Sequence, residues 1–280
     1  MTPHTSVSRR SFLAAAAASA AFAVRAESPS IPIGLELYSV RDDLEKDPQG
    51  TVRAVAKMGY QDVEFYAPYL DWTPQQAREM RRVLDDAGIH CWSTHNGLDS
   101  FGDKLPHAIE LNRIIGSRYV VLAHPGEVQG LDGYKRIADR LNEATRKLKP
   151  VGLKAGYHNH QDEFKPIDGK RPIEVIAANT DKSVMLQFDV GTCVEVGGDP
   201  VAWVESNPGR IKSMHLKDWS PGRGYKVLFN EGVVPWKKLF AAAESTGGVE
   251  YYLIEQEGSD YPELDTAQRC LVAYRKLRAS

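Results

Sequence analysis

The sequence lacks three features that mark whole classes of proteins. It has only three cysteines in 280 residues and no Cys-x-x-Cys pair, which excludes a disulfide scaffold. No apolar run reaches the roughly 18–20 residues that a membrane-spanning helix needs. A surplus of basic residues is also missing, because 35 Lys and Arg stand against 37 Asp and Glu. This balance argues against a dedicated nucleic-acid binder.

The composition is that of an ordinary globular protein. Hydrophobic residues make up 42% of the chain and charged residues 26%, values that argue against disorder, collagen and coiled coil. A chain of this length buries a full hydrophobic core without the help of disulfides or zinc.

The first 26 residues predict a signal peptide. Residues 8–13 read Ser-Arg-Arg-Ser-Phe-Leu, a twin-arginine pattern, and an alanine-rich apolar stretch follows over residues 13–24. Residues 27–280 would then form the mature chain, with the formal charge changed from −2 to −5 by the loss of three arginines. We therefore expect export by the twin-arginine route to the periplasm or the medium. The alternative is an alanine-rich N-terminal helix.

Eight β-branched or aromatic runs alternate with helix-like segments along the rest of the chain. They cover residues 31–38, 62–66, 89–95, 119–124, 153–160, 184–190, 211–218 and 251–257. Asp47-Pro48 and Thr73-Pro74 predict helix starts, and Thr73 with Gln76 fits a capping box. The glycines that predict helix ends are Gly59, Gly88, Gly116, Gly152 and Gly247.

This alternation predicts a single α/β domain with a parallel sheet. Eight strand–helix units match the typical length of a (β/α)8 TIM barrel, roughly 250 residues. A doubly wound open sheet is the alternative, but no Gly-x-Gly-x-x-Gly follows the first run.

Ionisable side chains collect at the ends of the predicted strands, where the active sites of barrels lie. They are Glu64, His95, His124, His158, His160, Asp189, His215 and Glu255. Imidazoles and carboxylates that converge at a barrel mouth suit a divalent metal. A core or capping role is the alternative for Glu64, His95 and His124. Asp189 and Glu255 follow apolar strands, where an unpartnered carboxylate is costly to bury.

Five stretches resemble the xylose-isomerase-like TIM barrels of the sugar phosphate isomerase/epimerase superfamily. They are residues 59–65, 152–164, 187–192, 210–218 and 253–257. The resemblance implies that Asp189, His215 and Glu255 are metal ligands. The family often has a glutamate ligand on the fifth strand, where this chain has His158. The His-Asn-His sequence of residues 158–160 looks more like the inosose-dehydratase-type branch, in which a histidine serves as the base.

The chemistry that the resemblance implies is proton transfer next to a carbonyl through an enediolate. The predicted metal ligands are His158, Asp189, His215 and Glu255. The predicted catalytic residues are His160, Glu255 and Lys217, and the predicted substrate-binding residues are Glu64, His95, His124 and Trp219. The expected cofactor is a divalent ion, namely Mn, Co, Mg or Zn. Manganese is favoured because the site has no cysteine, and because folding before export avoids competition from copper and zinc.

The sequence thus predicts a metal-dependent isomerase or epimerase of a small sugar or keto-sugar. One alternative is a keto-sugar dehydratase or an enzyme that cleaves glycosides by elimination. Another is a sugar-binding barrel without catalysis. A metal-dependent endonuclease shares this barrel, but the acidic mature charge opposes it. We expect no nucleic-acid partner and no stable membrane insertion after signal cleavage, and the sequence leaves open whether the chain forms a homo-oligomer.

Overall fold

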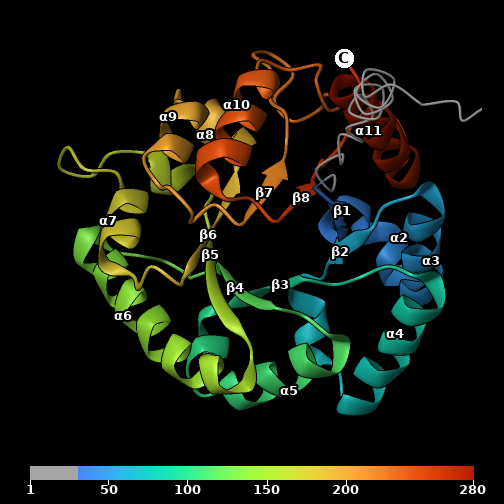
Figure 1. Ribbon diagram of the computed structural model, residues 1–280, viewed down its shortest axis with the longest axis horizontal. Coiled ribbons are helices and arrows are strands. Elements are labelled where there is room, and N and C mark those ends of the chain that lie inside the picture. The colour runs from blue at the N-terminus through green and yellow to red at the C-terminus, as the bar shows by residue number, and fades with distance from the viewer. Residues whose placement is uncertain (1–30) are drawn as a thin grey trace, which may run out of the picture. The chain divides into compact units, whose positions relative to one another are not determined.

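Residues 31–280 are the part of the chain that the computed structural model describes (Figure 1). The predicted signal peptide therefore lies outside the described residues. None of the described helices is long and apolar enough to cross a membrane.

Eight parallel strands form a closed barrel. The strands are β1 (Ile33–Glu36), β2 (Asp62–Glu64), β3 (Ser93–Gly97), β4 (Tyr119–His124), β5 (Lys154–His158), β6 (Met185–Asp189), β7 (Ser213–Leu216) and β8 (Tyr251–Ile254). Their order is β2-β1-β8-β7-β6-β5-β4-β3. Parallel bridges from Asp62 to His90 and from Phe65 to Thr94 join the two ends and close the ring. The predicted TIM barrel is confirmed, and the open doubly wound sheet is excluded.

Helices surround the barrel on its outer side (Figure 1). They are α2 (Arg41–Lys46), α3 (Pro48–Met58), α4 (Pro74–Ala87), α5 (Leu105–Ile115), α6 (Gly130–Leu148), α7 (Pro172–Asn179), α8 (Val190–Glu195), α9 (Pro200–Glu205), α10 (Trp236–Ala242) and α11 (Glu263–Arg278). Short helical turns follow several strands, among them η1 (Leu37–Val40), η2 (Ala67–Asp71) and η5 (Gln161–Phe164). Each unit returns the chain to the same end of the barrel, so every strand points its carboxyl end the same way.

The local signals of the sequence set the helix boundaries. Asp47 accepts a hydrogen bond from the Gly50 backbone N–H at 2.9 Å, and Thr73 forms the predicted capping box with Gln76. Four of the five predicted helix-ending glycines have left-handed backbones. The fifth prediction, Gly247, is wrong by one residue. Gly248 takes the positive φ of 76°, because α10 continues into a wider π-helical turn that extends through Gly247.

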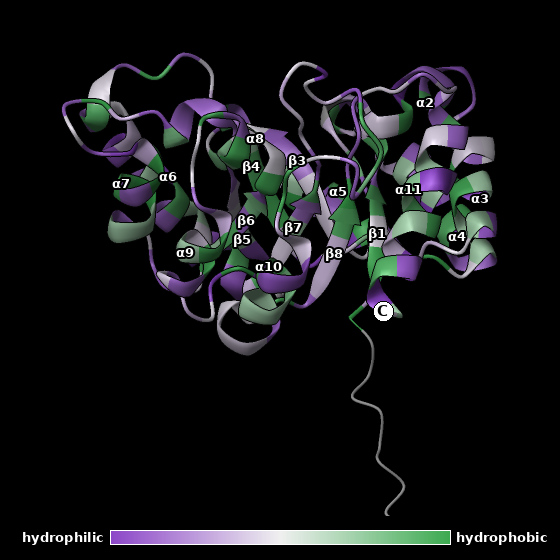
Figure 2. Ribbon diagram, turned by 90° about the horizontal axis from the view of Figure 1, so that it is seen from above, coloured by the Kyte–Doolittle hydropathy of each residue, from purple (hydrophilic) through white to green (hydrophobic). Residues whose placement is uncertain are grey.

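The barrel interior has an apolar floor and a polar upper layer. The floor consists of Tyr119, Val121, Met185, Tyr251 and Leu253, all at most 1% exposed. Figure 2 shows hydrophobic stretches on the central strands. Strands that are apolar on both faces are typical of a parallel sheet covered by helices. The floor closes the barrel from below, and so the polar side chains near the carboxyl ends of the strands lie in one enclosed space.

Removing the side chain that caps α4 should measurably destabilise the barrel. Thr73→Ala loses the Thr73 Oγ1 acceptor for the Gln76 N–H, and we expect the free energy of unfolding to fall by about 1 kcal/mol. Urea denaturation followed by circular dichroism measures this change. Arg78→Ala, an exposed substitution on the same helix, is the control and should change stability by less than about 0.5 kcal/mol. Equal stability of the two variants would contradict the assignment of the cap.

Candidate metal centre

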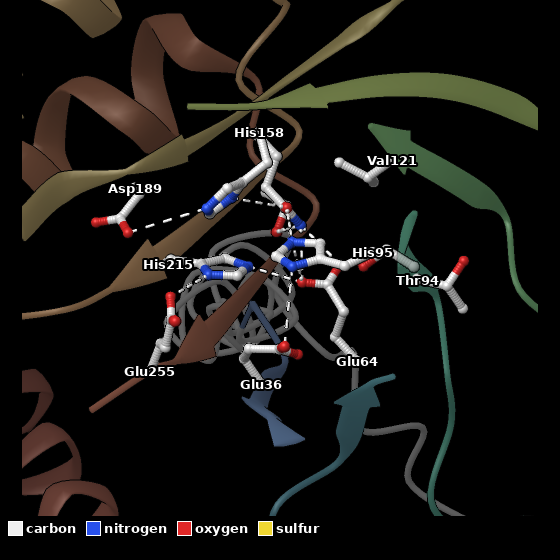
Figure 3. Close-up of polar contacts among 12 residues, drawn as sticks. Glu36, Glu64, Thr94, His95, Val121, His158, Asp189, His215 and Glu255 are labelled. Carbon is white, nitrogen blue, oxygen red and sulfur yellow. Dashed lines mark hydrogen bonds and ion pairs between the residues drawn. The ribbon is translucent and has the colours of Figure 1, made fainter. Parts of the chain in front are cut away.

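Six of the predicted site residues form one buried cluster at the carboxyl ends of the strands (Figure 3). They are Glu64 of β2, His95 of β3, His158 of β5, Asp189 of β6, His215 of β7 and Glu255 directly after β8. Each of these six residues is buried, with at most 6% of its surface exposed. These residues come from six strands that are far apart in the sequence, so it is the closed parallel sheet that brings them together.

Three of the four predicted ligands offer donor atoms to one point. One atom each from His158, Asp189 and Glu255 lies within 4.8 Å of the others. The closest approach of His158 and Asp189, from Nε2 to Oδ2, is 4.0 Å. The fourth predicted ligand, His215, contacts this group through its Nδ1, which lies 2.7 Å from Glu255 Oε2. Imidazole nitrogen and carboxylate oxygen without sulfur form a donor set that fits a divalent ion.

His215 is held between two carboxylates. Its Nδ1 bonds Glu255 Oε2 and its Nε2 bonds Glu64 Oε2, each at 2.7 Å. Burial alone would lower the pKa of His215, but the hydrogen bonds to Glu255 and Glu64 outweigh it and raise the pKa well above its usual value. A histidine that binds metal through one nitrogen commonly donates its other N–H to a carboxylate. Glu64 occupies that position for Nε2, so Nδ1, which faces Glu255, is the nitrogen that a metal ion could use.

Gln187 fixes the tautomer of His158. Its Nε2 donates to Glu64 Oε1 at 2.8 Å, so its Oε1 is the atom that faces the two histidines. That oxygen accepts from His158 Nδ1 at 3.1 Å and from His95 Nε2 at 2.7 Å. His158 then carries its proton on Nδ1 and turns the lone pair of Nε2 toward Asp189. Burial, together with the neighbouring His95 and His215, holds the pKa of His158 well below its usual value.

Glu36 is a further member of the cluster, and the sequence analysis missed it, as it missed the role of Gln187. The carboxylate ends β1 beside Glu64, and its Oε1 lies 3.8 Å from His95 Nδ1. Oε1 has no hydrogen-bond partner in the described part of the chain. Burial raises the pKa of Glu36 to about 8, with Glu64 adding to the rise and His95 opposing it. The available signal was a carboxylate inside the first apolar run, as Glu64 lies in the second.

Lys217 neutralises the carboxylates on the far side of the cluster. Its Nζ lies 3.3 Å from Asp189 Oδ2 and 3.6 Å from Glu255 Oε1, and it also bonds Glu257. Burial opposes the charge, but the three carboxylates raise the pKa of Lys217 well above its usual value. The Tyr225 ring covers the ammonium at 4.8 Å. The structure therefore places the predicted catalytic lysine inside the candidate centre, beside two predicted ligands.

His124 and His160 lie above the cluster, at the wall of an outer cavity of about 700 Å³. The ring of His160 is 4.8 Å from that of His158 and 5.9 Å from that of His124, centre to centre. Burial lowers the pKa of His160 to about 4, against the opposing effect of Glu255. The ionisable lining of the cavity is otherwise acidic, with Glu127, Asp162 and Glu163.

Trp219, the remaining predicted substrate-binding residue, lies on the loop after β7. Its backbone N–H donates to Asp218 Oδ1 at 2.9 Å, and Asp218 also accepts from Gly232 N–H and from Trp236 Nε1. Within residues 31–280, no hydrogen bond or aromatic contact joins Trp219 to the histidine cluster. Contact of Trp219 with a substrate therefore stays a prediction.

The fold and the cluster define the class of this protein, a TIM barrel whose mouth holds a metal-type centre of histidines and carboxylates. Residues 52–274 match the family described as xylose isomerase-like TIM barrel, and the chain belongs to this family. The resemblance found in the sequence is confirmed at this level.

Individual relatives share only part of their length with this chain. A rhizopine catabolism protein of Rhizobium meliloti is 28% identical over 182 residues, 57% of this chain and 54% of the relative. An inosose dehydratase of Clostridium beijerinckii is 36% identical over 86 residues, 30% of this chain and 28% of the relative. The chain thus spans about half or less of the length of these curated relatives. A sugar phosphate isomerase/epimerase from Parabacteroides distasonis has the same fold, with a TM-score of 0.75 at 24% identity over 89% of this chain and 95% of that one.

Removing the charge that orients His215 should weaken metal binding. Glu64→Gln keeps the size of the side chain but removes the carboxylate that fixes the Nε2 proton. We expect the dissociation constant for Mn²⁺ to rise about 10–100-fold, the usual effect of losing a partner of a ligating histidine. Calorimetric titration with Mn²⁺ measures it. Glu205→Gln, an exposed substitution at the end of α9, should bind as the wild type does. Unchanged affinity in Glu64→Gln would remove Glu64 from the centre.

Proposed function

We propose that the protein abstracts a proton next to the carbonyl of an unphosphorylated sugar-like ketone and that loss of a neighbouring hydroxyl follows. The observation that carries this proposal is the grouping of His158, Asp189 and Glu255 donors beneath His160 and beside the Lys217 ammonium. A divalent ion held by the donors would supply polarisation of the substrate carbonyl. The other steps depend on the side chains of the chain itself.

His160 is the residue that we assign as the base. Glu255, the other predicted base, already contacts His215 at 2.7 Å and Lys217 at 3.6 Å, so both of its oxygens have cationic partners. His160 instead lies between the cluster and the outer cavity, where a substrate enters, and it is only partly buried. An imidazole at such a position can accept a proton from carbon and pass it to a leaving group.

Lys217 is placed to stabilise the charge that proton loss creates. An enediolate carries negative charge on oxygen, and a fixed ammonium in a buried site stabilises it more strongly than water does. The position of Lys217 is fixed by Asp189 and Glu257 before any substrate arrives. Such preorganisation favours catalysis over simple sugar binding, because a binding protein needs no buried cation beside a metal-type donor set.

Elimination fits the site better than epimerisation. Epimerases of the family use two facing glutamate ligands that exchange the substrate proton, and the fifth strand of this chain offers His158 in place of one of them. The Nδ1 proton of His158 is bound by Gln187, and its Nε2 faces Asp189. His158 therefore makes a poor second acid–base group. The partial similarity to an inosose dehydratase supports the same outcome.

The outer cavity favours a substrate without phosphate. Its volume of about 700 Å³ is ample for a sugar, and no Lys or Arg is among its lining residues. Lys165, the nearest cation in the sequence, is paired with Asp162 at 2.8 Å. A phosphate group would meet the carboxylates of Glu127 and Asp162 there, which is electrostatically unfavourable, whereas Glu163 is turned toward Tyr157 and the His160 N–H.

Export by the twin-arginine route and manganese as the metal are parts of the same proposal. The pattern of residues 8–24 supports export, and phosphorylated sugars are scarce outside the cytoplasm, which agrees with the acidic cavity. A donor set of oxygen and nitrogen suits manganese, and loading it before export avoids displacement by copper or zinc.

Reaction in deuterated water tests the proposed chemistry. We expect the Mn²⁺-loaded protein to exchange the hydrogen next to the carbonyl of at least one keto-sugar or keto-cyclitol and to release water from it, as followed by NMR and mass spectrometry. Exchange with a change of configuration but no loss of water would establish epimerisation instead. Absence of exchange across the panel, with metal bound, would overturn the proposal in favour of a binding protein.

His160→Gln should lower the turnover number about 10²–10⁴-fold, the usual contribution of a general base, while Mn²⁺ content stays at the wild-type level. His90→Gln is the matched control, because His90 is exposed and stacks on Trp92 away from the cluster. Wild-type turnover in His160→Gln would exclude His160 as the base, and parallel losses in both variants would mean that the effect is structural.

A further inference from the structure

A second cavity, of about 220 Å³, lies at the amino ends of the strands, opposite to the candidate metal centre. Tyr119, Lys154 and Met185, the first residues of β4, β5 and β6, line it, and Lys212 just before β7 completes that side. The apolar floor of the barrel separates this cavity from the metal-type cluster, since Tyr119 and Met185 belong to both the floor and the cavity wall.

The lining of this cavity is basic. Its five cationic side chains are Lys149, Lys154, Lys182, Arg210 and Lys212, and none of its lining residues is Asp or Glu. These residues come from the end of α6, the start of β5, the turn before β6 and the segment before β7. Segments that are far apart in the sequence thus place five cations around one small cavity.

Arg210 is the most deeply buried of these cations, at 4% exposed, and it forms no ion pair within residues 31–280. Its Nη1 donates to the Ala177 carbonyl at 2.6 Å and its Nη2 to Thr180 Oγ1 at 2.7 Å. Its Nε is buried and has no partner in the described part of the protein, where no ion pair of Arg210 occurs either. The Val184 carbonyl also accepts from Nη2 at 3.1 Å, and Ala177 lies in the last turn of α7, where the helix dipole is negative. These groups offset part of the guanidinium charge, and a bound anion would compensate the rest.

The other cations are also short of acidic partners. Two carboxylates lie close by: Glu250, 3.6 Å from Lys212 Nζ, and Asp181, whose pKa is lowered by hydrogen bonds from Ser183 and by the charges of Lys149 and Arg210. Lys154 Nζ lies 3.3 Å from the Tyr119 hydroxyl, which itself donates to Glu250. Lys149 and Lys182 are exposed at the rim and form no ion pair within residues 31–280. The cavity therefore carries a local excess of positive charge in a chain whose net charge is −2.

We propose that this cavity binds a small divalent oxyanion, namely free phosphate or the phosphate group of a small ester. Lysine and arginine donors are the groups that recognise phosphate oxygens, and the cavity volume suits a ligand of this size. Features at the amino ends of barrel strands serve stability rather than catalysis. The bound anion would hold the starts of β5, β6 and β7 together beneath the barrel floor.

Thermal unfolding and calorimetry with inorganic phosphate test the proposal at constant ionic strength. We expect a saturable rise in Tm and a measurable Kd in the wild type. The double variant Lys149→Gln/Lys182→Gln removes two exposed cations from the rim without touching the carbonyls that Arg210 holds, and its Kd should rise at least tenfold. Lys237→Gln/Lys238→Gln on α10 removes the same charge elsewhere and should bind as the wild type does.

Two results would contradict anion binding in this cavity. A Tm that rises linearly without saturation, or an equal loss of binding in the two double variants, would mean non-specific screening and would overturn the proposal. Tighter binding of glycerol phosphate than of inorganic phosphate would assign the ester as the ligand, and the reverse would assign the free ion. The result is independent of the proposed catalysis, because neither double variant alters the metal-type cluster.

Discussion

The hydrogen-bonded chain Glu64–His215–Glu255 is the interaction on which the candidate site depends. It links β2, β7 and β8 through two contacts of 2.7 Å, and Gln187 extends it from β6 to His95 and His158. Breaking such a chain would leave a buried charge without a partner, which costs several kcal/mol. The network therefore keeps the ligand atoms in place and also restrains the strand ends that carry them.

Charge balance explains why so many ionisable groups can be buried together. The carboxylates of Glu64, Asp189 and Glu255 face three cations, His95, His215 and Lys217, while His158 stays neutral. Burial alone would lower the pKa of His95, but Glu64 raises it to about 9. Glu36, the outer carboxylate of the group, has a raised pKa and so binds a proton at neutral pH. A divalent ion in this centre would replace protons now shared between the ligands.

The fold could be predicted because its signals are local, whereas the site could be predicted only in part. Spacing of runs, the Thr73 capping box and the helix-ending glycines all report on neighbouring residues, and the structure agrees with each except at Gly247. Asp189 and Glu255 stood out as carboxylates after apolar strands. Glu36 and Gln187 did not, because each lies inside an apolar run and gains its role from partners on other strands. Such contacts depend on sheet register, which a single sequence does not display.

The two ends of the barrel carry opposite charge, and helix dipoles explain part of this difference. The surrounding helices run antiparallel to the strands, so their positive amino ends lie near the acidic mouth and their negative carboxyl ends near the basic cavity. In α6, Asp132 lies in the first turn and Arg146 and Lys147 in the last, as the dipole favours. This effect accounts for Lys149, which directly follows α6. It also reaches Arg210, whose Nη1 donates to the Ala177 carbonyl in the last turn of α7. The Arg210 Nε stays buried and unpaired within residues 31–280, and a bound anion at the cavity would compensate the charge that the helix end leaves over.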